Sequence, residues 1–223
     1  MAIRKPTART ALLVGATGLI GRELLTLLRD SAAYRHTHLL LRRAVPGLAP
    51  DARVTPLVVD FAALPDPLPA VSDVYIALGT TTKVAGSQAA FRRVDFDHVV
   101  DVARAAHAAG ARRLAVVSAL GADPNSAVFY NRVKGEMQAA IAQLGYASVV
   151  IAQPSLLIGD RTALGQPTRG GEVWINRLLN PWMGLVPRGV RPIKASAVAA
   201  ALLAATLDAT PGVRILSSGD MQR

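Results

Sequence analysis

A phenol and an ammonium stand four residues apart in the second half of the chain, at Tyr130 and Lys134. On a helix this spacing places both groups on one face. A free tyrosine exchanges protons poorly near neutral pH unless its phenolate is stabilised by a neighbouring ammonium and an oxidised nicotinamide ring. Ser118 ends an expected strand 12 residues before Tyr130, and its hydroxyl could hold a substrate carbonyl oxygen during hydride transfer. Ser118, Tyr130 and Lys134 are therefore the predicted catalytic residues.

A glycine-rich turn near the N-terminus has the spacing of a phosphate-binding loop. It follows an apolar run, opens an amphipathic one, and reads Gly15-Ala16-Thr17-Gly18-Leu19-Ile20-Gly21. Gly15 permits a tight turn, Gly18 lets the backbone approach a pyrophosphate, and Gly21 lets helix and strand pack closely. The N–H groups that open the helix then face the anion. We expect residues 15 and 17–20 to contact a dinucleotide, because the strand, turn and helix occur in the required order.

The residues after the second expected strand help to predict which nicotinamide cofactor is bound. An NAD-binding protein places Asp or Glu about 20 residues beyond the glycines to hold the ribose 2′-hydroxyl. This chain has Arg42 and Arg43 there, and its next acid is Asp51. Two guanidinium groups can clamp a 2′-phosphate through charge-assisted hydrogen bonds. NADP(H) is the predicted cofactor, although solvent-exposed arginines would be unremarkable in an Arg-rich chain.

Short apolar runs alternate with longer runs of helical period, which predicts an α/β fold of the Rossmann type with a doubly wound parallel sheet. We expect one domain over residues 1–223, with a loop-rich, Gly- and Pro-rich substrate-side lobe at 159–192 that contains a short helix at Glu172–Leu179. The other helices are expected at Leu19–Arg29, Ser87–Ala109, Val128–Leu144 and Ala195–Leu207. The strands are expected at Thr10–Val14, His36–Leu41, Arg53–Val59, Asp73–Leu78, Arg113–Val117, Ser148–Ala152 and Val213–Leu216.

The glycine loop together with Ser and Tyr-x-x-x-Lys resembles the short-chain dehydrogenase/reductase superfamily over nearly the whole chain. The sequence is most similar to the small, atypical, NADP-binding members labelled NAD-dependent epimerase/dehydratase-like, the group of the Tat-interacting oxidoreductase. The matching segments are Tyr75–Thr81, Val94–Phe96, Val117–Ala122, Tyr130–Glu136 and Gln153–Gly159.

This resemblance implies further cofactor contacts, and it also has gaps. It implies that Leu78, Gly79 and Thr80 contact the cofactor after the fourth strand. Asp60 would lie near the adenine, and Pro154 and Ser155 would lie beside the nicotinamide. Dimers are common in the superfamily, so a homodimer is possible. The asparagine that completes the proton relay in better-known members has no evident counterpart, and the corresponding helix carries Asp95, Asp97 and His98 instead.

Composition excludes several other classes of protein. The chain has 223 residues and no cysteine, which rules out disulfides, cysteine nucleophiles and thiolate-bound metals. The four histidines share no ligand spacing, so no metal site is expected. The apolar runs are too short to span a bilayer, and the interrupted run from Ala11 does not resemble a signal peptide, so a cytoplasmic protein without a membrane partner is expected. The net charge of +10 is scattered along the chain, which argues against a nucleic-acid partner.

The combined signals favour an NADP(H)-dependent oxidoreductase that acts on a small carbonyl or alcohol substrate. Two alternatives stay open. A cofactor-sensing or protein-binding regulator would keep the dinucleotide site with little turnover, and a small nucleotide-sugar epimerase would share all the motifs. Trp174 and Trp182 could line a substrate pocket or equally pack the lobe onto the sheet. Arg161 and Arg169 could meet a phosphate or carboxylate of cofactor or substrate, or equally be ordinary charged loop residues.

Overall fold

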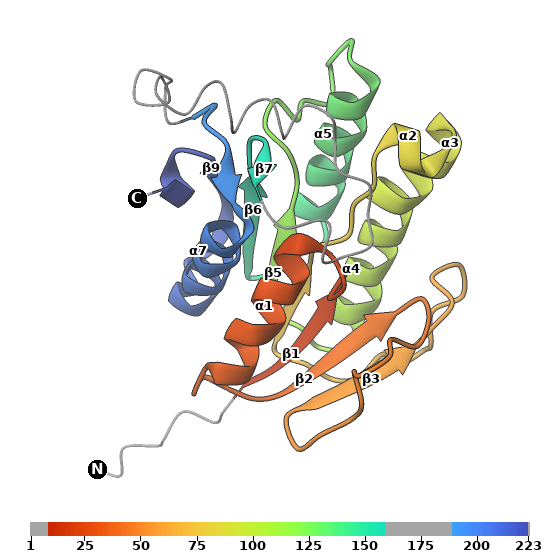
Figure 1. Cartoon of the computed structure of the whole chain (residues 1–223), viewed down its shortest axis with the longest axis vertical. Helices are drawn as coiled ribbons and strands as arrows, with labels where there is room; N and C mark the ends of the chain where they lie inside the picture. Colours follow the sequence, from red (N-terminus) through yellow and green to blue (C-terminus); the bar gives the residue numbers. More distant parts are fainter. Residues whose placement is uncertain (1–8, 159–188, 223) are drawn as a thin grey trace.

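The computed structural model describes residues 9–158 and 189–222. Its centre is a seven-stranded sheet in the order β3-β2-β1-β4-β5-β6-β9, in which every neighbouring pair is parallel (Figure 1). The strands are β1 (Arg9–Val14), β2 (Tyr34–Leu41), β3 (Val54–Val58), β4 (Asp73–Ile76), β5 (Arg113–Val117), β6 (Ser148–Gln153) and β9 (Gly212–Ser217). The order reverses between β1 and β4, which creates the crevice where doubly wound proteins bind their ligands. The predicted fold class is confirmed.

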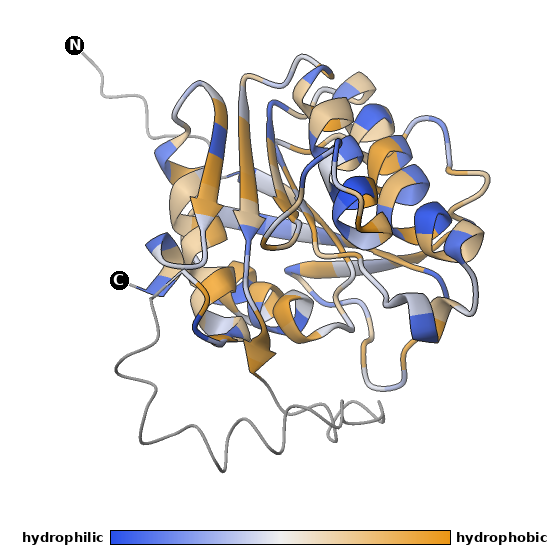
Figure 2. Cartoon of the chain, turned by 90° about the horizontal axis from the view of Figure 1, so that it is seen from above, coloured by the Kyte–Doolittle hydropathy of each residue, from blue (hydrophilic) through white to orange (hydrophobic). Residues whose placement is uncertain are grey.

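Helices cover both faces of the sheet (Figure 1). One face packs against α1 (Leu19–Asp30) and α7 (Ala195–Asp208), and the other against α4 (His98–Ala108) and α5 (Phe129–Ala142). Each face has its own core of buried aliphatic side chains, and apolar colouring follows the inner strands in Figure 2. Among the described residues no helix is long and apolar enough to cross a membrane.

The single long helix expected over Ser87–Ala109 is divided into three parts. It consists of α3 (Gln88–Arg92), a π-helical segment η1 (Arg93–Asp97) and α4. A short helix α2 (Thr82–Ala85), which the sequence did not indicate, precedes them. Phe91, Asp95 and Val99 are buried at four-residue spacing through the widened turn, so the π segment keeps one continuous buried face. π-Helical turns of this kind are frequent at functional sites.

Smaller differences concern the ends of the elements. Strand β4 ends at Ile76, so Leu78 lies in the loop that follows, and β2 begins at Tyr34, two residues before the expected start. Two-residue strands β7 (Leu157–Ile158) and β8 (Ile193–Lys194) pair in parallel beside the main sheet. The chain ends in a short 3-10 helix η4 (Asp220–Gln222). Most of the expected lobe at 159–192, including the helix at Glu172–Leu179, lies outside the described residues.

A buried polar cluster joins strands at the amino-terminal edge of the sheet, opposite the expected site. The Asp73 carboxylate is fully buried, accepts a hydrogen bond from the Tyr34 hydroxyl at 2.5 Å and pairs with Arg113 at 2.5 Å. The Tyr34 and Tyr75 hydroxyls lie 2.8 Å apart. Tyr146 lies elsewhere in the core and donates to the Ala103 carbonyl at 2.7 Å. Burial raises the pKa of Tyr34, Tyr75 and Tyr146 well above the ordinary value.

These buried phenols predict a loss of stability at alkaline pH. A tyrosine whose pKa is raised in the folded state stabilises the fold fully below the unfolded pKa of about 10, and this contribution is lost as the pH rises above that value. Each such tyrosine adds up to about 1.4 kcal/mol of lost stability per pH unit. Urea unfolding at pH 8 and pH 11 should show a smaller alkaline loss for Tyr146→Phe than for the wild type. Equal losses in the two proteins would contradict this prediction.

Candidate functional site

The loop between β1 and α1 is held closely against the loop after β4. Gly15 has a φ of +87°, and a Cβ at this position would lie 2.5 Å from the Ala77 carbonyl oxygen. A Cβ at Gly21, in the first turn of α1, would lie 2.0 Å from the Gly15 carbonyl oxygen. Backbone packing therefore requires glycine at both positions.

Gly18 differs from these two glycines because the protein itself leaves room for a side chain there. Its φ is −80°, and the nearest atoms to an added Cβ would be carbonyl oxygens at 3.4 and 3.9 Å. No contact within the described chain demands glycine at this position. The space beside Gly18 is compatible with the close backbone approach that the phosphate-loop motif predicts there.

The other loop residues present mainly backbone toward the crevice. Thr17 is exposed and Leu19 is half-buried, whereas the Ile20 side chain is 5% exposed and belongs to the core on the α1 face. Ile20 can therefore offer its N–H group to a ligand, but not its side chain. This arrangement fits an anion held by N–H groups at a helix N-terminus.

The two arginines after β2 are exposed and form no hydrogen bond or ion pair within the described chain. The first acid after them, Asp51, is occupied by structural contacts. Its carboxylate accepts hydrogen bonds from the Arg53 and Val54 N–H groups at 2.8 and 2.7 Å and pairs with Arg29. The Arg53 N–H group in particular lowers the pKa of Asp51. The loop thus offers Arg42 and Arg43, but no free carboxylate, to a ribose near the end of β2.

Lys134 lies on α5 and forms a buried ion pair that the sequence did not predict. Its Nζ lies 2.7 Å from Asp95 Oδ1, and the two side chains are 3% and 0% exposed. The other carboxylate oxygen of Asp95 accepts a hydrogen bond from the Thr80 N–H group at 2.9 Å. Asp95 is therefore a buried carboxylate that connects the loop after β4 with α5. Lys134 is therefore a paired cation in this structure.

Tyr130 and Ser118 have different surroundings. Tyr130 lies in the first turn of α5, half-buried, with its ring centroid 5.4 Å from that of Phe91. Ser118 follows β5, is 4% exposed, and accepts a hydrogen bond from Gln138 at 2.5 Å. Gln138 Oε1 in turn accepts from Gln153 at 3.1 Å. Tyr130, Lys134 and Gln138 recur every four residues on α5, so one helix face carries all three toward the carboxyl edge of the sheet.

Sequence reasoning missed Asp95 and Gln138. Asp95 lies 39 positions before its partner Lys134, and no local spacing connects the two. A signal for Gln138 was present, because it continues the four-residue spacing from Tyr130 and Lys134, and an uncharged polar residue on an inward helix face requires a partner.

The other predicted cofactor-binding residues lie around the same edge of the sheet, and their side chains differ in exposure. Gly79 is exposed, Leu78 and Thr80 are half-buried, and Pro154 is buried. Asp60 is exposed after β3, where its carboxylate accepts a hydrogen bond from the Ala62 N–H group at 2.9 Å. The Ser155 hydroxyl donates to the Arg191 carbonyl and lies 2.9 Å from the Ser218 hydroxyl. The Ser155 side chain is thus held by residues from the C-terminal part of the chain.

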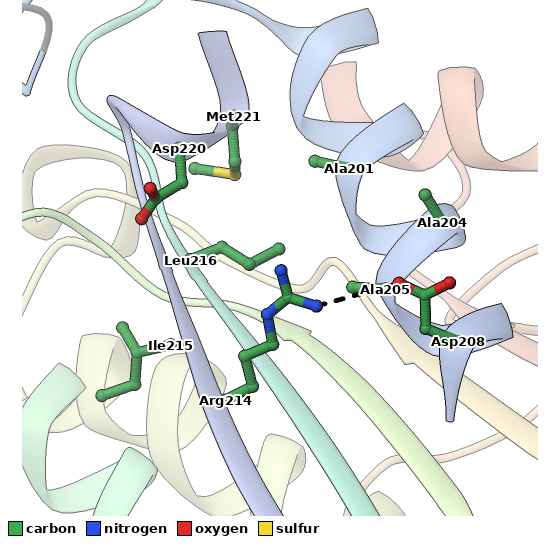
Figure 3. A pocket seen from close by; sticks show the side chains of 9 residues that line it. All are labelled: Ala201, Ala204, Ala205, Asp208, Arg214, Ile215, Leu216, Asp220 and Met221. Atoms are coloured by element: carbon green, nitrogen blue, oxygen red, sulfur yellow. Dashed lines mark ion pairs between the residues drawn. The ribbon is translucent and has the colours of Figure 1, made fainter. Parts of the chain in front are cut away.

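The remaining candidates are four residues of the expected lobe, a metal site and a hollow elsewhere in the fold. Arg161, Arg169, Trp174 and Trp182 lie outside the described residues. Within residues 9–158 and 189–222 no group of three or more His, Asp or Glu side chains is placed to hold a metal ion. Figure 3 shows a hollow between α7 and β9, where Arg214 pairs with Asp208 at 3.8 Å above small apolar side chains. None of its lining residues belongs to the predicted site.

The strand order, the glycine loop at the first crossover and the helix carrying Tyr-x-x-x-Lys define an atypical short-chain dehydrogenase/reductase-like Rossmann protein. A family model described as NAD(P)H-binding matches residues 15–156. The chain belongs to this family.

Two curated relatives have sequences similar to that of this chain. The protein FMP52, mitochondrial, of Eremothecium gossypii is 37% identical over 153 residues, which cover 68% of this chain and 67% of that protein. Its counterpart in Coccidioides immitis is 30% identical over 239 residues, covering 96% of this chain and 95% of that protein. These relatives are named as mitochondrial proteins, so the expected cytoplasmic location is wrong. That expectation was based on the absence of secretory and membrane-spanning segments, which does not separate cytoplasm from mitochondrion.

Solved structures with the same fold bind nicotinamide cofactors. MoeE5 in complex with UDP-glucose and NAD superposes with a TM-score of 0.66 at 18% identity, covering 93% of this chain and 75% of that one. The Bordetella bronchiseptica enzyme WbmG in complex with NAD gives 0.68 at 16% identity, covering 98% and 75%. At such low identity the likeness shows the fold alone.

Proposed function

We propose that the protein is an NADP(H)-dependent oxidoreductase that transfers a hydride between the nicotinamide and a small carbonyl or alcohol substrate. One observation carries the proposal: the glycine loop, the arginines after β2 and the α5 face with Tyr130 and Lys134 all lie at the carboxyl edge of one parallel sheet. In this arrangement the β1–α1 loop binds the pyrophosphate, and Arg42 and Arg43 hold the 2′-phosphate. Leu78, Gly79, Thr80, Asp60, Pro154 and Ser155 border the rest of the cofactor.

The chemistry that we assign to the catalytic residues follows from their hydrogen-bonding capacity. The cofactor supplies the hydride. Ser118 accepts a hydrogen bond from Gln138, which leaves its own proton available for a substrate carbonyl oxygen. Tyr130 gives the proton that this oxygen needs as the hydride arrives at carbon. Lys134 forms an ion pair with Asp95, and its ammonium group carries N–H donors for ribose hydroxyls or the phenol.

A panel of carbonyl compounds tests the function. NADPH oxidation should be followed with phenanthrenequinone, nitrobenzaldehyde and small aliphatic aldehydes, for the wild type and for Tyr130→Phe. Turnover that depends on Tyr130 supports an oxidoreductase. Tight NADPH binding with no Tyr130-dependent turnover would favour the sensing or protein-binding alternative.

Cofactor preference gives a separate prediction. Charge-assisted hydrogen bonds contribute about 1.5–3 kcal/mol each, so Arg42→Ala/Arg43→Ala should weaken NADPH binding by about a hundredfold and leave NADH binding nearly unchanged. The matched control is Arg35→Ala/Arg112→Ala, which removes two exposed arginines from the opposite edge of the sheet. Isothermal titration of both cofactors measures the effect. An unchanged NADPH dissociation constant in the first variant would refute the NADP(H) assignment.

A further inference from the structure

The pair formed by Asp95 and Lys134 is buried directly beneath the loop that follows β4. A Cβ added at Gly79, which is exposed, would lie 3.5 Å from Asp95 Oδ1 and 3.9 Å from Lys134 Nζ. Gly79 therefore lies in contact distance above the buried pair. A ligand that lies on Gly79 therefore lies within reach of the ammonium group.

Asp95 is the link between two parts of the site. One carboxylate oxygen holds the Thr80 N–H group in the loop after β4, and the other holds Lys134 on α5. The π-helical segment η1 presents this carboxylate inward between the apolar contacts of Phe91 and Val99. A buried ion pair adds little net stability because both charges lose their hydration. Stability alone therefore gives little reason for this pair, whereas its place at the crevice gives a functional one.

We propose that Asp95 is a positioning residue that anchors Lys134 and neutralises its charge, so that Tyr130 works beside a neutral ion pair and not beside a free cation. This proposal depends on the reductase function proposed above. A carboxylate bonded to the ammonium cancels most of the field that the cation alone would exert on a phenol one helical turn away. Removing the carboxylate would favour the phenolate and shift its formation to lower pH.

The direction of the effect on turnover follows from the proton balance. In carbonyl reduction, hydride goes to the carbonyl carbon and the phenol proton goes to the oxygen, so the phenol must be protonated. In Asp95→Asn the reduction rate should therefore fall off on the alkaline side at a pH about one unit lower than in the wild type, since one nearby charge shifts an ionisation by about one unit or more. Asparagine can still accept the Thr80 hydrogen bond, so the loop after β4 keeps its anchor.

The other charged groups on the surrounding elements stay unchanged in this variant. Arg92 of α3 and Glu136 of α5 are paired with one another. Arg132 of α5 donates to the Ser126 carbonyl at 2.8 Å. The remaining charged or titratable side chains are exposed or half-buried and lie on α2, on η1 and α4, and in the loop after β5: Lys83, Arg93, Asp97, His98, Asp101, Arg104, His107 and Asp123.

Tyrosinate absorbance tests the proposal without any substrate. The chain has four tyrosines, and burial raises the pKa of the other three, so the tyrosinate absorbance that is lost in Tyr130→Phe is assigned to Tyr130. This signal should appear at a pH about one unit lower in Asp95→Asn than in the wild type. The matched control is Asp97→Asn, which removes the same charge from an exposed position on η1 and should shift nothing.

A double variant keeps the test decisive if Asp95→Asn does not fold. Asp95→Asn/Lys134→Met replaces both charges by neutral groups, which proteins commonly tolerate better than an unpaired buried charge. Its Tyr130 signal should return close to the wild-type pH, whereas Lys134→Met alone should move it upward. Identical pH dependence in wild type and Asp95→Asn, or in Lys134→Met and the double variant, would overturn the proposal. A lack of Tyr130-dependent turnover alongside the expected absorbance shift would instead count against the reductase function.

Discussion

Replacing Tyr130 by phenylalanine is expected to lower NADPH-dependent carbonyl reduction about a thousandfold, because general acid catalysis by a positioned side chain contributes about 10² to 10⁴ in rate. The substitution removes only the hydroxyl and keeps the ring that packs against Phe91 at 5.4 Å. The affinity for NADPH should therefore stay within about twofold of the wild type. Steady-state kinetics and a binding titration on the same preparation separate the two quantities.

Tyr146→Phe is the matched control for this substitution. It makes the same chemical change in the core, where the hydroxyl donates to the Ala103 carbonyl, and it should leave the turnover rate unchanged. A Tyr130→Phe protein that reduces carbonyls as fast as the wild type would exclude Tyr130 as the proton donor.

Replacing Gly21 by alanine is expected to produce a large loss of stability. The added Cβ would lie 2.0 Å from the Gly15 carbonyl oxygen and 2.7 Å from its carbonyl carbon, and both are backbone atoms that cannot rotate away. Overpacking of this kind costs about 3 kcal/mol. For a domain of this size the melting temperature should fall by roughly 6–12 °C. Calorimetry or urea unfolding measures the change.

Gly18→Ala is the control within the same loop. Its Cβ would meet carbonyl oxygens only at 3.4 and 3.9 Å, and its φ of −80° is one that alanine adopts readily. The melting temperature should therefore stay within a few degrees of the wild type. Equal losses for Gly18→Ala and Gly21→Ala would show that close packing between β1 and α1 does not distinguish the two positions.

The features predicted correctly from the sequence are those recorded in short stretches of chain. The parallel strands appear as continuous apolar runs, and the tight turn between β1 and α1 places three glycines within seven residues. The spacing of Tyr130 and Lys134 follows from one helical period. In each case the physical constraint acts between neighbouring residues, so its signature is local.

The features that were missed depend on contacts between distant segments. The π-helical turn that presents Asp95 leaves no pattern that separates it from an ordinary α-helix of the same composition. Its pairing with Lys134 forms only when η1 and α5 pack together. The hydroxyl of Ser155 is likewise held by Arg191 and Ser218, which come from the far end of the chain. Strand β4 ends at Ile76 although apolar residues continue to Leu78, because the chain turns there toward Gly15.

The most direct test of dinucleotide binding at the β1–α1 loop is a calorimetric titration of NADPH into the wild type and into Gly18→Ala, with melting temperatures measured in parallel. A methyl group at residue 18 would stand where the pyrophosphate must approach the backbone. The wild type should bind NADPH, and Gly18→Ala should bind it at least tenfold more weakly at an unchanged melting temperature. Equal affinity in the two proteins, or no binding by the wild type, would contradict the assignment of this loop as the cofactor site.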